Sequence, residues 1–132
     1  METEKSILEL AREQFKTWND ALQTKNPAEV AKLYRDDCLL LPTFPEDGKE
    51  AVGKEGVKDY FDHFLTKSPI GIIITEEVKE KAKNLIKYSG KYDFEVGLNG
   101  KREIIHAEYI FIWKKENEKW GIIFHYSAPL DK

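Results

Sequence analysis

The chain has 132 residues, of which 41% are hydrophobic and 34% charged, and its formal net charge is −3. This length suits one domain with a core large enough to fold without a metal or a disulfide, so we expect residues 1–132 to form a single domain. A nucleic-acid-binding module would be basic with clustered Lys and Arg, so the slightly acidic balance argues against nucleic acid as a partner.

The single cysteine, Cys38, cannot form an internal disulfide, and its apolar neighbours predict a small buried side chain. Cysteine poverty is typical of cytosolic proteins. The charged start Met1–Lys5 lacks the apolar core of a signal peptide. No apolar run approaches the ~20 residues that a membrane span needs. We therefore expect a cytoplasmic chain that has no membrane partner.

The first predicted helix covers about residues 3–24, because apolar residues recur there at steps of three and four. Thr3 or Ser6 can be its N-cap, and Glu9 would complete a capping box with Ser6. The apolar face consists of Ile7, Leu8, Ala11, Phe15, Trp18 and Leu22.

Two further helices are predicted, with a strand between them. Asn26 as cap and Pro27 at the first helical position indicate a short second helix. Residues 36–37 are both Asp and predict a turn, after which 38–41 is expected to be a buried strand. A loop then leads from 42 to about 53, and a third helix covers about 54–66. Its apolar stripe is Val57, Tyr60, Phe61, Phe64 and Leu65.

From residue 70 onward the apolar period becomes two, which is typical of strands with one buried face. Residues 86–96 alternate in this way, and Asn99-Gly100 predicts a tight hairpin because both turn positions require positive φ. Return strands are expected at 104–113 and 120–127, with a turn near 115–118 between them. Three helices grouped early must cover one face of an antiparallel sheet. The predicted class is therefore α+β, with three N-terminal helices packed on a curved antiparallel sheet that forms a cone.

Several segments in this order resemble a known family. They are Trp18 with Leu33–Asp37; Leu41-Pro42-Thr43; Tyr60–Leu65; Gly90-Lys91-Tyr92; and Trp120–Ser127. From Trp18 to Pro129 the chain resembles the association (hub) domain of calcium/calmodulin-dependent protein kinase II and its stand-alone bacterial relatives, within the nuclear-transport-factor-2-like fold. The chain has no kinase signature, so the resemblance implies a hub alone, which associates with itself as a homodimer or a larger ring.

The resemblance also implies two departures from related pockets. Kinase hubs line the cone with two arginines that hold small carboxylates, and the matching positions are Phe111 and Tyr126, neither of which is charged. Ketosteroid isomerases share the fold and keep a carboxylate base at the position of Leu41, and a hydrocarbon cannot accept a proton.

The aromatic residues predict the lining of the cone, and the sequence leaves open whether they form a packed core or an apolar pocket with Tyr hydroxyls. The candidate ligand-binding residues are Trp18, Tyr34, Phe61, Phe64, Tyr92, Tyr109, Phe111, His125 and Tyr126. In the final strand, Tyr126 is placed in the same inward phase as Trp120, Ile122 and Phe124.

The three histidines have different interpretations. His125 lies in the opposite phase to Tyr126, and we interpret it as a hydrogen-bonded histidine at a subunit interface, with an acid or base at the pocket mouth as the alternative. His106 shares a strand face with Glu108, which suggests an exposed or interface pair, or a metal or proton relay. No third ligand has suitable spacing, so neither a metal nor a cofactor is predicted. His63 is expected to be solvated.

Two functions follow from these observations. The first is a self-associating, hub-like domain without a catalytic motif, because the outer face of 104–112 is half apolar and pairing two sheets would bury it. The alternative is a small isomerase, dehydratase or cyclase-type enzyme, or a binder, that acts on an apolar or aromatic compound in the cone. The sequence does not decide whether the chain is an enzyme.

Overall fold

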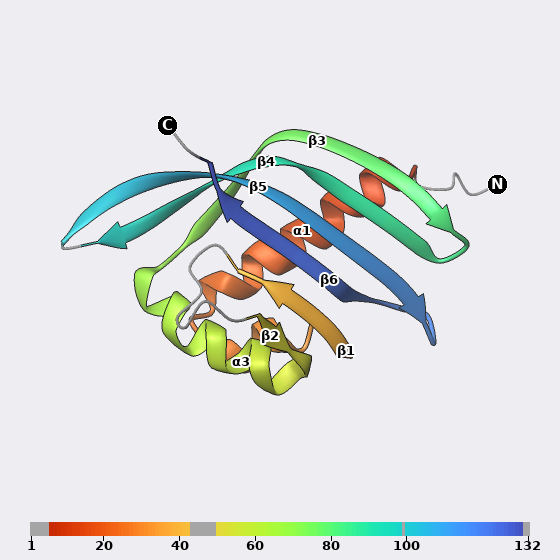
Figure 1. The fold of residues 1–132 in the computed structure, drawn as a ribbon, viewed down its shortest axis with the longest axis horizontal. Helices are drawn as coiled ribbons and strands as arrows, with labels where there is room; N and C mark the ends of the chain where they lie inside the picture. Colours follow the sequence, from red (N-terminus) through yellow and green to blue (C-terminus); the bar gives the residue numbers. More distant parts are fainter. Residues whose placement is uncertain (1–5, 43–49, 99, 131–132) are drawn as a thin grey trace.

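A computed structural model describes residues 6–42, 50–98 and 100–130. The helices α1 (Ile7–Gln23), α2 (Pro27–Ala31) and α3 (Gly53–Phe64) pack against one face of a curved sheet, and a short 3₁₀ helix (Leu65–Lys67) follows α3 (Figure 1). This arrangement confirms the predicted α+β class and the helical layer on one side of the sheet.

The sheet has six strands in the described ranges, in the order β2-β1-β6-β5-β4-β3. They are β1 (Tyr34–Leu41), β2 (Ala51–Val52), β3 (Ile70–Ala82), β4 (Leu85–Leu98), β5 (Lys101–Glu116) and β6 (Lys119–Pro129). The expectation of a wholly antiparallel sheet is wrong at one place, because β1 runs parallel to β6. Hairpins impose antiparallel pairing only on consecutive strands. A long connection through α3 joins β1 to the strands beyond it, so local sequence does not set its direction.

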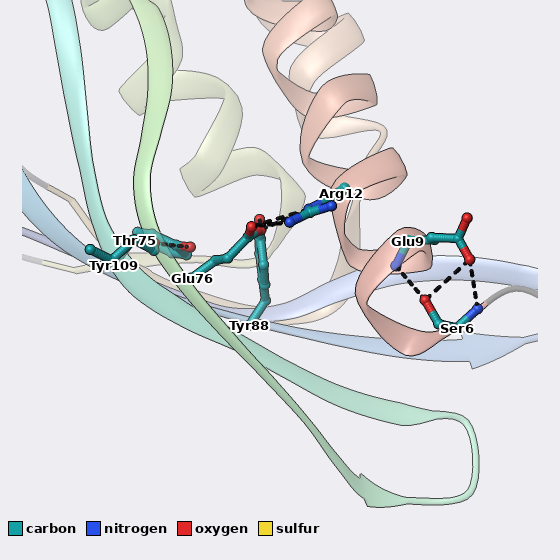
Figure 2. Close-up of polar contacts among 7 residues, drawn as sticks. All are labelled: Ser6, Glu9, Arg12, Thr75, Glu76, Tyr88 and Tyr109. Atoms are coloured by element: carbon teal, nitrogen blue, oxygen red, sulfur yellow. Dashed lines mark hydrogen bonds and ion pairs between the residues drawn. The ribbon is translucent and has the colours of Figure 1, made fainter.

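Helix α1 begins at Ile7 rather than at about residue 3, and of the two candidate caps it is Ser6 that caps it. Ser6 Oγ accepts from the Glu9 backbone N–H at 3.1 Å, and Glu9 Oε1 accepts from the Ser6 N–H at 3.1 Å, which completes the capping box (Figure 2). The buried face consists of Ala11, Phe15, Trp18 and Leu22. On the side that meets the edge strand β3, the Asn19 amide accepts from Gly71 N at 2.9 Å and donates to Gly71 O at 3.0 Å. The side chain therefore occupies the place of a neighbouring strand and covers part of that edge.

The strand β1 is longer than predicted. Asn26 caps α2 by accepting from Ala28 N at 3.0 Å, as expected. The predicted turn at 36–37 is wrong, because both aspartates lie in β1. The pairing of β1 with β6 shifts register between Tyr34 and Leu39, and such an irregularity lets two consecutive polar residues remain exposed inside a strand.

The third helix spans 53–64 rather than 54–66, and its last predicted turn is the 3₁₀ segment. Ser68 then leaves the helical region with φ 49°. In the predicted loop, residues 51–52 form the short β2 and pair with β1, while residues 43–49 lie outside the described residues.

Long hairpins join β3, β4, β5 and β6. Leu98 pairs with Lys101, so a two-residue turn joins β4 to β5, with Gly100 at φ 78°. This agrees with the hairpin prediction, although Asn99 itself lies outside the described residues. Asn117 and Glu118 both adopt positive φ between β5 and β6, so the second turn is shorter than the predicted 115–118 segment.

At Gly90 the backbone of β4 leaves no room for a side chain beside β3. The φ of Gly90 is 154°, and a Cβ added there would lie 2.2 Å from Thr75 O. The β3–β4 register shifts between Ile73 and Thr75, which is where this contact occurs. Because a bulge bends a strand and increases its twist, glycine at this position permits the curvature that closes the sheet around α1.

Candidate functional site

The inner face of the sheet and the helices enclose the cone predicted from the sequence. Eight of the nine candidate residues are buried there, each at most 3% exposed. They are Trp18, Tyr34, Phe61, Phe64, Tyr92, Tyr109, Phe111 and His125. Helices α1 and α3 and strands β1, β4, β5 and β6 thus contribute to one cluster of aromatic rings.

The ninth candidate, Tyr126, is on the opposite face. The β5–β6 register shifts so that Trp113 pairs with Ile122 and Ile112 pairs with Phe124. This bulge reverses the alternation of β6 after Ile122, so the inward phase predicted for Phe124 and Tyr126 is wrong. The same shift turns His125 inward, so the interpretation of His125 as an outer-face interface residue is also wrong.

His125 belongs to a continuous chain of hydrogen bonds across the cone. Trp18 Nε1 donates to Tyr34 Oη at 3.0 Å, and Tyr34 Oη lies 2.8 Å from His125 Nδ1. On the other side of the ring, His125 Nε2 lies 3.2 Å from Tyr92 Oη, which donates to Ser127 Oγ at 2.6 Å. Five side chains from α1, β1, β4 and β6 are therefore linked inside an apolar environment.

The hydrogen-bond directions assign a tautomer to His125. With the Tyr92 hydroxyl donating to Ser127, His125 Nε2 carries the hydrogen and donates to Tyr92. The Nδ1 atom is then the acceptor for the Tyr34 hydroxyl. Burial lowers the pKa of His125 from 6.5 to about 3, which keeps the ring neutral. The imidazole stacks on Phe111 with ring centroids 4.0 Å apart.

The described residues of the cone have little of the chemistry that an acid–base catalyst needs. Burial raises the pKa of Tyr34 and of Tyr92, so both phenols stay protonated at neutral pH. Among the described residues, the hydrogen-bond partners of His125 are hydroxyls rather than carboxylates. Within the described ranges no carboxylate hydrogen-bonds to His125, so no such group stabilises the protonated imidazole. Leu41, at the position of the isomerase base, is a half-buried hydrocarbon.

The space left in the cone is small. A void of about 10 Å³ lies among the aromatic rings, close to the lower limit for one water molecule. Trp18, Phe61, Phe64, Tyr92 and His125 line it among the predicted residues. Leu40, Pro42, Tyr60, Phe94 and Ser127 also line it and were not among the candidates. Ser127 lies two residues after His125 and therefore on the same face of β6. The sequence did not identify Ser127 as a lining residue, because without the bulge both residues are expected to face outward.

The remaining histidines lie outside the cone. His106 and Glu108 share a face as predicted, but they have different partners: His106 Nδ1 lies 2.6 Å from Asp93 Oδ1, and Glu108 Oε2 accepts from Tyr126 Oη at 3.1 Å. His63 is exposed on α3, as expected. Across the described ranges, no group of three or more His, Cys, Asp or Glu side chains could hold a metal ion.

Cys38 is buried with 1% of its surface exposed, as predicted. Burial raises the pKa of its thiol, which disfavours the nucleophilic thiolate. None of the helices in the described part of the chain is long and apolar enough to cross a membrane.

A polar cluster joins α1 to the edge strand β3 and its neighbour β4 (Figure 2). The Arg12 guanidinium donates to the Glu76 carboxylate on β3, and Tyr88 Oη on β4 donates to Glu76 Oε1 at 2.6 Å. These hydrogen bonds lower the pKa of Glu76, with that from Arg12 having the larger effect. Tyr109 Oη donates to Thr75 O at 3.0 Å beside them. The cluster fixes how α1 lies across the curved strands.

The outer face of the sheet carries a second feature, which we call the outer apolar patch. It consists of two rows across three neighbouring strands: Leu39, Phe124 and Ile112 in one row, and Leu41, Tyr126 and Ile110 in the other. All six side chains are half-buried in the single chain. A hollow of about 360 Å³ adjoins the patch beside Tyr126, with Ser89, Lys91 and Glu108 in its wall.

The architecture is that of the nuclear-transport-factor-2-like, or cystatin-like, class of folds. A scytalone dehydratase homologue from Novosphingobium aromaticivorans matches with a TM-score of 0.79 and 14% identity, covering 95% of this chain and 86% of that one. The CamKII hub homology domain of Chlamydomonas reinhardtii matches with a TM-score of 0.77 and 15% identity, covering 96% of this chain and all of that one (100%). At these identities the likeness shows the fold alone.

The family follows from two closer matches. The family model of the calcium/calmodulin-dependent protein kinase II association domain matches residues 8–130. An association domain of this kind from Xanthomonas campestris is 36% identical, with a TM-score of 0.91, and covers 98% of this chain and 91% of that one. The chain belongs to the calcium/calmodulin-dependent protein kinase II association domain family. No curated protein sequence matches it.

Proposed function

We propose that this chain is a non-catalytic association domain that pairs with a second copy of itself through the outer apolar patch. The observation that carries the proposal is the continuous two-row arrangement of that patch across three neighbouring strands. Burial of such a patch against an identical sheet removes apolar surface from water. Membership in an association-domain family supports a second copy as the occupant.

The charges on the same face support a symmetric pairing. Along the outer side of β4, Lys87 and Lys91 come first, and Asp93 and Glu95 follow. A two-fold axis across the sheet brings the basic end of one copy toward the acidic end of the other. Such complementarity favours one orientation of the two copies over others.

Light scattering on a size-exclusion column tests this proposal. We expect a mass well above the 15.4 kDa of one chain at micromolar concentration. Phe124→Lys places a charge in the patch and should shift the mass to that of a monomer without unfolding the chain. Ile7→Lys is the matched control, since Ile7 is also half-buried but lies on α1, and it should leave the mass unchanged. A wild-type monomer, or a Phe124→Lys variant with wild-type mass, contradicts the proposal.

A second candidate function is the binding of a small apolar or aromatic ligand in the cone. The buried hydrogen-bond chain favours it, because a few polar groups in an apolar wall are typical of ligand sites. The scytalone dehydratase homologue with the same fold also supports a ligand site in the cone, because it is named for a reaction on a small molecule. The void of about 10 Å³ requires the cone to widen around such a ligand. Thermal-shift screening with aromatic, steroid-like and carboxylate compounds tests it, and the absence of any rise in Tm would leave the cone as a structural core.

A further inference from the structure

Strand β1 begins at the same end of the sheet as the turn between β5 and β6 (Figure 1). A cleft outside the cone lies at this end. Its volume is about 350 Å³, within the lower range of small-molecule sites. It is lined by Lys32, Tyr34, Arg35, Asp36, Lys54, Glu116, Asn117, Lys119, Trp120 and Gly121. We call it the β1 cleft. It shares only Tyr34 with the candidate residues of the cone.

The β1 cleft is rich in cations although the chain is acidic overall. Its walls carry four basic side chains and two acidic ones. Two of the four basic groups are already engaged: Lys32 pairs with Glu29 at 3.0 Å, and the Arg35 guanidinium pairs with Glu116. The other two, Lys54 and Lys119, are held more loosely.

Lys54 Nζ lies 3.9 Å from Asp36 Oδ1, and the Asp36 side chain is 94% exposed, so solvent weakens this pair. Lys119 forms no ion pair with any residue that the structure describes. Two ammonium groups are therefore available to an anion that enters the cleft.

Arg35 supplies a further positive charge. Its Nε atom is buried and has no hydrogen-bond partner among the described residues, but it is ion-paired with the carboxylate of Asp37 at 3.5 Å. Glu116 pairs with the other end of the same guanidinium, so Arg35 is a fixed part of the cleft wall. Gly121 allows this placement, since a Cβ there would lie 2.7 Å from Arg35 Cγ. The arginine stem thus lies directly on the backbone of β6.

One wall of the cleft is an indole ring. Trp120 is half-buried, whereas Trp18 and Trp113 are 1% and 2% exposed in the core. A partly exposed indole offers a flat apolar surface on which a planar ring can stack. The cleft therefore combines an aromatic surface with cationic donors.

We propose that the β1 cleft binds a small phosphorylated compound with a planar ring, of the mononucleotide class. The phosphate is held by Lys54 and Lys119, with Arg35 adding positive charge in the wall, while the ring stacks on Trp120. This site is separate from the outer apolar patch, so its occupation does not depend on self-association.

Titration of the full chain with AMP tests the proposal by intrinsic fluorescence and by calorimetry. AMP should quench the fluorescence of Trp120, and Trp120→Phe should abolish that change because the other two indoles are buried. Adenosine and inorganic phosphate, which each supply one half of the recognition, should bind about tenfold more weakly or worse than AMP.

The double variant Lys54→Gln/Lys119→Gln should weaken AMP binding by about tenfold or more, because two charge-assisted contacts are lost. Lys16→Gln is the matched control, since Lys16 is 77% exposed on α1 and lies outside the cleft, and it should bind AMP as the wild type does. Both lysines of the cleft are on the surface, so the double variant should fold. The proposal is overturned if AMP gives no signal at millimolar concentration, or if the double variant binds AMP as tightly as the control.

Discussion

Acidification is expected to destabilise the folded chain through His125. Burial lowers the pKa of the folded imidazole from 6.5 to about 3, whereas the unfolded chain keeps the ordinary value. Between these values the unfolded chain binds a proton that the folded chain does not bind, so stability is lost as the pH falls. The loss begins near the unfolded pKa of 6.5 and ends near the folded pKa of about 3.

The size of the effect follows from the width of this window. Each pH unit inside it removes about 1.4 kcal/mol from the free energy of unfolding. Lowering the pH from 6.5 to about 5 therefore costs about 2 kcal/mol. The free energy of unfolding of a small domain is only about 5–15 kcal/mol. A loss of about 2 kcal/mol through one buried group is therefore a sizeable share of the total stability.

Urea unfolding at a series of pH values, at fixed protein concentration, measures this cost. His125→Gln should be less stable than the wild type at neutral pH, because it disturbs the hydrogen-bond chain. The stability difference between the two proteins should shrink by about 2 kcal/mol between pH 6.5 and about pH 5, since only the wild type has the buried imidazole. His63→Gln, which removes an exposed histidine, should keep the pH dependence of the wild type.

Parallel pH curves for the wild type and His125→Gln would refute the reasoning, because they would mean that folded His125 takes up a proton at an ordinary pH. Nitrogen-15 NMR of the histidine rings gives a second measurement. The His125 ring should show a hydrogen on Nε2 and no titration down to about pH 5.

Three further variants test other parts of the fold. Gly90→Ala should lower the free energy of unfolding by about 3 kcal/mol or more, or prevent folding, because its Cβ would lie 2.2 Å from Thr75 O. A loss under about 1 kcal/mol in urea unfolding would show that β3 can move away. Tyr92→Phe should cost about 1–3 kcal/mol, because it leaves the His125 Nε2–H without its acceptor, and an unchanged urea midpoint would argue against that hydrogen bond. Asn19→Ala should cost about 1–3 kcal/mol and speed hydrogen exchange at Gly71, whose amide it otherwise covers; unchanged exchange there would contradict the edge-covering role.

Local signals in the sequence predicted those parts of the fold that depend on neighbouring residues. The Ser6 capping box, the Asn26 cap and the turn at Gly100 are all found where the residue types indicate. The alternation of β4 identified Tyr92 as an inward residue, and the spacing in α1 did the same for Trp18. Such signals are reliable because caps, turns and strand faces are set within a few residues of chain.

Features that join distant segments were not predictable in this way. The bulge in β6 moved Tyr126 outward and His125 inward, and its position is set by how β5 and β6 pair rather than by the residues of β6 alone. The parallel pairing of β1 with β6 likewise depends on where α3 delivers the chain.

The sequence by itself determined a cone of aromatic residues with helices on one side of a sheet, because periodicity and caps are local properties. Only the tertiary structure decided that this cone is nearly filled and that its polar groups satisfy one another through His125. It also brought Arg35, Lys54 and Lys119 around one cleft. Packing and hydrogen-bond partners arise between segments far apart in the chain, and their geometry depends on bulges and register shifts that no short stretch of sequence specifies.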